Sequence, residues 1–266
     1  MLAVEVNSIF SNIFGWTLII GTIFSYIPQY YRIYKKGNSE GISQYMLISG
    51  SLSCIFNILG SIQENLNNIQ DCNSFKNNNC YEIIMPIIQL FIPGICIYIF
   101  YIYFIYYIKN SNRLTYLDEN IRIYFNFKVV LVINLLLIIF TILQDTIQLI
   151  NNVIPINQTG KIYNILSAVF SLFMWIPQIK ETYEVKRNAS LSILALSIHG
   201  AGCGLTVIYQ IIYNKQSIFV VLCYGIAFFC EYFIVFMCIY YNQKEKSKNK
   251  PKKEFNEIKT KLLNKI

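Results

Sequence analysis

Two stretches of the sequence decide the fold: residues 25–43 read SYIPQYYRIYKKGNSEGIS, and residues 174–192 read MWIPQIKETYEVKRNASLS. They align at an offset of 149 residues, and both run from an apolar segment through Ile-Pro-Gln into a basic turn. A proline within a helix removes one N–H donor and clashes with the carbonyl four residues back, so it bends or ends the helix. The carboxamide of the next residue can donate and accept, and we expect it to satisfy the backbone groups that the proline frees.

The composition assigns the chain to the membrane. Of its 266 residues, 55% are hydrophobic and 14% are charged, and the mean hydropathy is +0.44. A soluble domain of this size cannot bury such a fraction. Seven apolar runs are each long enough to cross a hydrocarbon layer of about 30 Å as a helix, and they lack the alternation of barrel strands. The sequence therefore predicts an all-α membrane protein with seven transmembrane helices, over residues 12–34, 42–63, 82–108, 127–150, 161–180, 190–212 and 217–241.

The basic residues predict the orientation. Nineteen of the 22 lysines and arginines fall on one side of the predicted spans, and only Lys76, Lys161 and Lys215 fall on the other. By the positive-inside rule the first side is cytosolic, so we predict a lumenal or extracellular N-terminus and a cytosolic C-terminus. Seven spans require termini on opposite sides, which agrees with the charge count. Because topology accounts for the net charge of +8, we predict membrane lipid and no nucleic acid as a partner.

The repeat extends beyond the two quoted stretches. Tyr26 meets Trp175 and Cys54 meets Cys203 at the same offset, and the third spans align at an offset of 134 through Ile-Tyr-Tyr at 105–107 and 239–241. Four spans separate the copies, so the halves share one orientation and form parallel repeats. The predicted domains are a three-helix repeat over residues 1–108, a cytosolic loop and linking helix over 109–160, a second three-helix repeat over 161–241, and a basic cytosolic tail over 242–266.

The duplicated element carries a resemblance to a known family. Two Ile-Pro-Gln segments, each followed by a basic loop and an SEGIS- or NASLS-like entry into the next helix, resemble the PQ-loop superfamily. This group includes cystinosin, the lysosomal cationic amino acid exporters, SWEET sugar transporters and, more distantly, the KDEL receptor; the chain is also similar to fungal and protist PQ-loop proteins. The resemblance covers about residues 15–241. It implies a 3+1+3 bundle whose hinges for alternating access are Pro28, Gln29, Pro177 and Gln178.

Polar residues within the predicted spans are the candidates for a substrate cavity or a coupling site, because a buried ionisable group is costly unless it faces a cavity. Glu231 lies near the middle of the last span, and as an unpaired carboxylate it would be protonated or would pair with a substrate cation. For His199, the only histidine, we favour a structural hydrogen bond over a proton relay. Other candidates are Asp145, Asn57, Gln89, Asn134, Tyr26 and Trp175.

One departure from the family limits the resemblance. Cystinosin-like members carry an acidic residue, linked to proton coupling, just after the Ser-x-x-Leu-Ser segment of the second loop. Here Gln44 and Ile193 follow Ser43 and Ser192 instead. Coupling to protons would therefore fall to Glu231 or Asp145.

Two features of the predicted lumenal loops concern modification. Cys72 and Cys80 share one loop, and an oxidising lumen would permit a disulfide between them. Two cysteines with no nearby histidine do not supply four zinc ligands, so we predict no metal site, and nothing in the sequence points to a cofactor. Asn157 begins an Asn-Gln-Thr glycosylation sequon in another loop.

The leading hypothesis for function is a transporter of an amino acid-like or sugar-like solute in a lysosome, a vacuole or another endomembrane, with protons as a candidate coupling ion. The alternative is a non-transporting protein on the same fold, either a cargo receptor or a regulator of membrane trafficking or lipid distribution. We predict no enzymatic activity, because the sequence lacks a Ser-His-Asp set, an HExxH motif and a glycine-rich phosphate loop.

Overall fold

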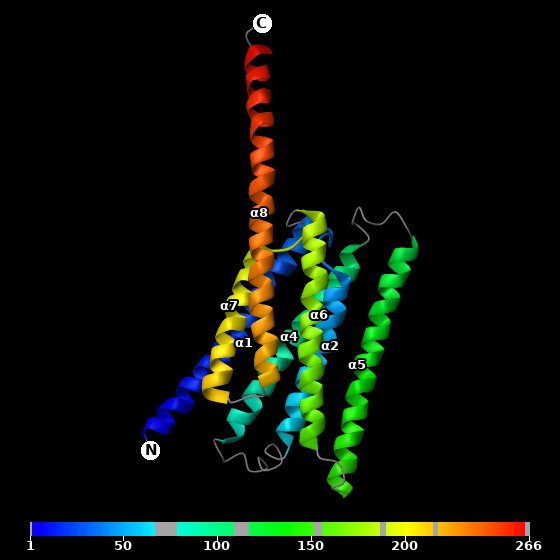
Figure 1. Ribbon diagram of the computed structural model, residues 1–266, viewed down its shortest axis with the longest axis vertical. Helices are drawn as coiled ribbons and strands as arrows, with labels where there is room; N and C mark the ends of the chain where they lie inside the picture. Colours follow the sequence, from blue (N-terminus) through cyan, green and yellow to red (C-terminus); the bar gives the residue numbers. More distant parts are fainter. Residues whose placement is uncertain are drawn as a thin grey trace.

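The computed structural model describes residues 2–66, 79–108, 117–151, 156–186, 190–214 and 218–263. Over these residues the chain forms seven long helices, which confirms the predicted all-α class (Figure 1). A single π-helical turn, η2 (Gln210–Asn214), continues the sixth of them. The helices are α1 (Leu2–Lys36), α2 (Gln44–Glu64), α4 (Asn79–Ile108), α5 (Leu117–Asn151), α6 (Ile156–Val185), α7 (Ile193–Tyr209) and α8 (Ile218–Leu263).

Length and hydropathy qualify six of these helices to cross a membrane. Their most apolar stretches have mean hydropathies between 1.4 and 2.4, and α1 is not among the six. Although α1 has 35 residues, it carries Thr17, Thr22, Ser25 and Gln29, all of which line the cavity described below. These polar residues place one face of α1 towards the interior of the protein, and α1 runs the length of the bundle beside its neighbours (Figure 1).

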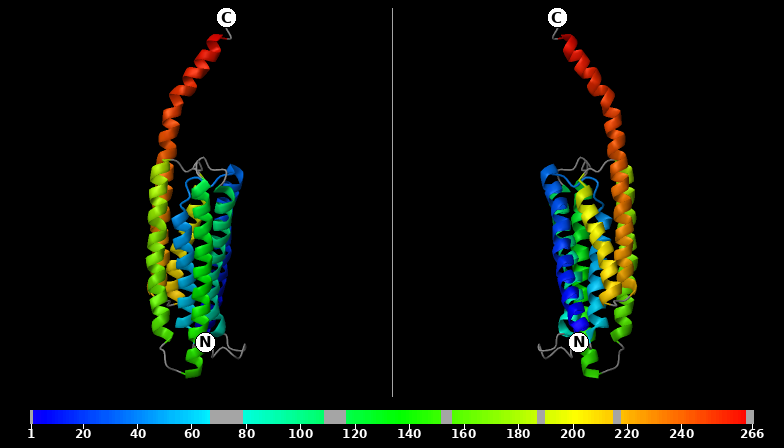
Figure 2. Two further views of the ribbon diagram at one scale, coloured as in Figure 1. Left: turned by 90° about the vertical axis from the view of Figure 1, so that its right-hand side faces the viewer. Right: turned by 90° about the vertical axis from the view of Figure 1, so that its left-hand side faces the viewer.

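The helices pair by one scheme in both halves of the chain. Within the first half α4 packs against α1 and α2, and within the second half α8 packs against α6 and α7. Across the halves α2 packs along α6 and α1 packs along α7. The linking helix α5 lies at one side against α2 (Figures 1 and 2), and only 17% of its apolar stretch is buried inside the protein, so most of it faces lipid.

The two halves approach each other most closely where α2 meets α6. A methyl group at Gly60 would lie 2.9 Å from the carbonyl oxygen of Gly160, and one at Gly160 would lie 3.0 Å from that of Gly60. The corresponding α1–α7 side is more open, because methyl groups at Gly21 and Gly202 would meet no atom within 4 Å. The α2–α6 contact is thus a tight seam, and space between the halves lies on the α1–α7 side.

Both repeated prolines lie inside helices. α1 continues past Pro28 to Lys36, and α6 continues past Pro177 to Val185. Of the two effects that the sequence allowed, neither proline therefore ends its helix. Whether the two positions act as hinges stays a prediction.

The ends of α1 and α6 also correspond. Gly37 follows α1 with a left-handed φ of 62°, and its N–H donates to the carbonyl of Ile33 at 2.9 Å. Lys186, at the equivalent position 149 residues on, follows α6 with a φ of 52°, and its N–H donates to the carbonyl of Thr182. A left-handed conformation costs a non-glycine residue roughly 1–2 kcal/mol. Lys186 takes this conformation nonetheless, so the second copy has the same turn after its helix as the first.

Beyond the bundle, α8 continues as one helix into the predicted basic tail (Figures 1 and 2). Cys72 lies outside the described residues, as do the side chains of Cys80 and Asn157, so the disulfide and the glycosylation remain predictions. Thr159 of the sequon lies within α6, where its hydroxyl donates to Gln63 Oε1 at 2.9 Å.

Candidate functional site

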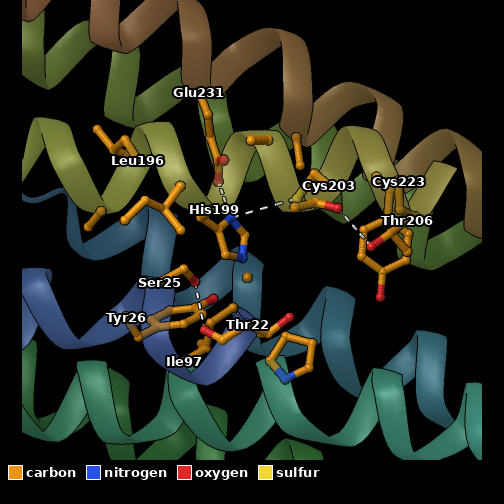
Figure 3. Close-up of a pocket in the computed structure, with 18 of the residues that line it drawn as sticks. Thr22, Ser25, Tyr26, Ile97, Leu196, His199, Cys203, Thr206, Cys223 and Glu231 are labelled. Atoms are coloured by element: carbon orange, nitrogen blue, oxygen red, sulfur yellow. Dashed lines mark hydrogen bonds and ion pairs between the residues drawn. The ribbon is translucent and has the colours of Figure 1, made fainter. Parts of the chain in front are cut away.

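A cavity of about 550 Å³ lies between the two halves. Side chains from α1, α2, α4, α6, α7 and α8 line it, so every helix except the linking helix α5 contributes (Figure 3). Among the described residues that line it there is no lysine or arginine. Its polar and titratable lining includes Thr22, Ser25, Tyr26, Asn57, Trp175, His199, Cys203, Thr206 and Glu231.

The one carboxylate in this lining is paired. Glu231 Oε1 on α8 lies 2.6 Å from His199 Nδ1 on α7, within hydrogen-bonding distance. Glu231 is only 2% exposed, and the ring of Tyr26 meets the imidazole edge-on, with 5.1 Å between the ring centroids. The expectation of an unpaired carboxylate at Glu231 is therefore wrong. Pairing with the imidazole lowers the cost of placing the carboxylate in lipid, because the pair can share one proton.

Three buried polar atoms in the cavity wall have no hydrogen-bond partner in the described structure. They are Asn57 Oδ1 on α2, Trp175 Nε1 on α6 and Glu231 Oε2 on α8. An unsatisfied buried donor or acceptor is costly, and such groups are expected to bind water or a ligand. The three residues come from both halves and line the cavity, whereas the three atoms themselves are buried.

The two repeated glutamines join the halves at one end of the cavity. Gln29 Nε2 donates to the carbonyl of Ser190 at 2.9 Å, and Gln29 Oε1 accepts from the backbone N–H of Ser192 at 2.7 Å. Gln29 is on α1, whereas Ser190 and Ser192 precede α7. We expected this carboxamide to satisfy the backbone groups that Pro28 frees. Instead it binds the loop of the opposite half.

Gln178 makes the same contacts in reverse. Its Nε2 donates to the carbonyl of Gly41 at 2.8 Å, and its Oε1 accepts from the backbone N–H of Ser43 at 2.9 Å. Gln178 is on α6, and residues 41 and 43 precede α2. Each glutamine thus holds the backbone at the start of the second helix of the other half. We call Gln29 and Gln178, with the four backbone groups that they bind, the glutamine latch.

Further contacts between the loops strengthen the latch. The Ser190 N–H donates to the carbonyl of Glu40 at 2.9 Å, and the Ser190 hydroxyl donates to the carbonyl of Asn38 at 2.8 Å. Both glutamines are buried, at 5% and 1% exposure. Since Gln29 also lines the cavity, the latch borders the cavity at this end of the bundle.

Three other predicted site residues lie outside the cavity lining. Asp145 Oδ1 on α5 accepts from Gln63 Nε2 at 2.9 Å. Gln89 Nε2 donates to the carbonyl of Gly15 at 3.3 Å, and Asn134 is hydrogen-bonded to the Tyr98 hydroxyl. These side chains join neighbouring helices, whereas Tyr26, Asn57, Trp175, His199 and Glu231 all line the cavity.

The structure also adds residues that sequence reasoning missed. Cys203 lies one helical turn after His199, with its Sγ 3.7 Å from His199 Nδ1. Thr22, Ser25 and Thr206 are further polar residues of the lining. The spacing of four residues between His199 and Cys203 was a usable signal, because residues i and i+4 share one face of a helix.

These features define a class: a helical membrane protein of two similarly paired three-helix halves, with a cavity between them and a Pro-Gln element in each half at one end. Residues 10–70, which include α2 and most of α1, match the family model described as the PQ loop repeat. Over these residues the chain carries a PQ loop repeat. The match covers the first copy of the element, and the second copy at 174–192 lies beyond it. No curated protein matches the chain.

Proposed function

We propose that the protein transports small solutes by alternating access, with the glutamine latch as the gate at one end. The observation that carries the proposal is the reciprocal latch over a solute-sized cavity between two halves. The latch consists of hydrogen bonds between the halves, which are broken and remade when the halves rock, whereas the glycine-lined α2–α6 seam favours a fixed contact. Pro28 and Pro177, each next to a latch glutamine, are in position to supply the bends that such rocking needs.

The cavity limits the class of solute. A volume of about 550 Å³ falls within the range of roughly 300–1,000 Å³ that is typical of small-molecule sites. Without lysine or arginine in its described lining, the cavity disfavours phosphorylated or multiply anionic solutes. The polar side chains of the lining, such as Asn57, His199 and Glu231, suit a neutral or cationic solute with hydroxyl or amino groups. We therefore propose an amino acid-like or sugar-like substrate.

The charge distribution supports the proposed setting. Because the loops of the latch and the tail hold most of the basic residues, we propose that the latch end faces the cytosol and the N-terminus lies in the lumen. We propose an endomembrane such as that of the lysosome or the vacuole. The lack of basic residues in the described lining also counts against the alternative of a receptor for an acidic peptide terminus.

The test is a flux screen on the purified full-length protein in proteoliposomes. Amino acids, sugars and lipids are offered at two pH values, and uptake is compared with that of Pro28→Leu and Pro177→Leu variants that insert normally. We expect saturable flux of one solute class in the wild type and reduced flux in both variants. Solute or peptide binding without flux would favour the receptor alternative, and normal flux in both variants would exclude the hinges.

A further inference from the structure

One wall of the cavity gathers three side chains that can ligate a metal. His199 Nδ1, Cys203 Sγ and a carboxylate oxygen of Glu231 all lie within 4.8 Å of one another. His199 and Cys203 are one turn apart on α7, and Glu231 reaches them from α8 (Figure 3). His199 Nδ1 lies 3.7 Å from the sulfur and 2.6 Å from Glu231 Oε1. We call these residues the His–Cys–Glu trio.

The first half of the chain shows that the fold does not require this trio. At the repeat offsets of 149 and 134, the equivalent residues are Gly50, Cys54 and Ile97. They meet in space as the trio does, because a methyl group at Gly50 would lie 3.3 Å from Ile97 Cδ1, and all three line the same cavity. One half thus builds this wall with a glycine, a cysteine and an isoleucine. The other half keeps the cysteine and adds a base and an acid.

Glu231 Oε2 supplies a second and independent observation. The residue is 2% exposed, and this oxygen has no hydrogen-bond partner in the described structure. It lies against α7 beside Gly200, the residue that follows His199, because a methyl group at Gly200 would meet it at 3.2 Å. A buried carboxylate oxygen without a donor is costly, and a cation beside it would remove that cost.

We propose that the His–Cys–Glu trio binds one divalent transition-metal ion of the Zn²⁺ class. Imidazole nitrogen, thiolate and carboxylate are its preferred donors. With bonds of about 2.0–2.3 Å, tetrahedral ligand atoms lie roughly 3.3–3.6 Å apart. The distance from His199 to Cys203 already approaches this value, and the distance from His199 to Glu231 widens by roughly 0.7 Å on binding. The sequence prediction of no metal site considered only the loop cysteines, Cys72 and Cys80.

Charge balance suits the membrane setting. A thiolate and a carboxylate neutralise a divalent ion, so the loaded site has no net charge inside the lipid-embedded bundle. The ligands must be deprotonated to bind, so the thiol proton and the proton shared by the imidazole and the carboxylate leave when the ion enters. Three protein ligands leave the fourth tetrahedral position open. Because the trio lines the cavity, water or a donor atom of a solute can occupy that position.

The test uses Co²⁺ as a spectroscopic probe on the full-length protein without a histidine tag. We expect one Co²⁺ per chain with a thiolate-to-metal charge-transfer absorption, which Zn²⁺ displaces. Cys203→Ser should abolish that absorption. His199→Asn and Glu231→Gln should weaken binding by at least the roughly 10- to 100-fold that is typical of losing an outer-shell partner.

The repeat supplies a matched control. Cys54 is the equivalent of Cys203 in the other half and lines the same cavity, so Cys54→Ser should leave binding unchanged. Absence of Co²⁺ binding by the wild type, or persistence of the charge-transfer absorption in a Cys203→Ser protein with wild-type thermal unfolding, would overturn the proposal. An equal loss in Cys54→Ser would do the same. Binding is measured at equilibrium without solute, so the result does not depend on whether the protein transports anything.

Discussion

Replacing Gln178 with leucine would remove one side of the glutamine latch at nearly constant side-chain size. Gln178 Nε2 donates to the carbonyl of Gly41, and its Oε1 accepts from the N–H of Ser43. Both backbone residues are buried, so the substitution leaves two buried polar groups without partners. Each such group costs about 1–3 kcal/mol. The closed state is therefore destabilised by about 2–6 kcal/mol relative to a state in which water reaches the loop.

A destabilisation of this size predicts a measurable increase in the fraction of protein that is open at the latch end. Because about 1.4 kcal/mol corresponds to a tenfold change, the lower end of this range predicts that the open fraction at this end rises by roughly 25-fold. The assay is the rate at which a membrane-impermeant maleimide, added from the latch side, labels Cys54 as the sole cysteine. Cys54 lines the cavity that the latch borders. Gln29→Leu should give a similar rise, since Gln29 makes the reciprocal pair of contacts.

The control is another buried glutamine. Gln89 on α4 donates to the carbonyl of Gly15 on α1, a contact within the first half, so Gln89→Leu should leave the labelling rate unchanged. If Gln178→Leu labels at the wild-type rate, or if Gln89→Leu accelerates labelling equally, the latch does not hold this end shut.

Three further predictions concern the seam, the cavity and the prolines. Gly60→Ala should destabilise the protein by about 1–3 kcal/mol in detergent thermal unfolding, because its methyl group would lie 2.9 Å from the Gly160 carbonyl oxygen. The methyl group of Gly21→Ala would meet no atom within 4 Å, so this control variant should unfold like the wild type. Trp175→Phe removes the unpartnered Nε1 donor and should raise the KM for the solute roughly three- to tenfold; an unchanged KM would remove Trp175 from the site. Pro177→Leu should slow solute flux while surface-accessible protein and insertion stay at wild-type levels, and a parallel loss of insertion would make the proline structural.

The helices could be predicted from the sequence because their signal is local. A run of apolar residues longer than a bilayer is thick admits few structures, and the predicted spans correspond to the observed helices. Several boundaries differ by a few residues. The helices α1 and α6 begin earlier and end later than predicted, at Lys36 and Val185, whereas α2 and α7 begin later, at Gln44 and Ile193.

The residues that line the cavity were harder to predict. In a membrane protein the sequence gives only a weak signal for which face of each helix points inwards. When both faces of a helix are apolar, the sequence does not reveal which polar residue faces inwards. Glu231, His199 and Asn57 line the cavity, whereas Asp145 and Asn134 contact neighbouring helices instead. The partners of the latch glutamines were also hidden, because a backbone amide has no signature in a sequence.

The reciprocity of the latch has a consequence for the origin of the chain. A twofold interface between identical subunits contains each contact twice. If residue i of one subunit binds residue j of the other, residue j of the first also binds residue i of the second. Gln29 with the start of α7, and Gln178 with the start of α2, satisfy that relation within one polypeptide. In a dimer of identical three-helix units, one glutamine per unit would form both halves of the latch. Two such units joined through α5 would be free to diverge at every position that the shared interface does not fix.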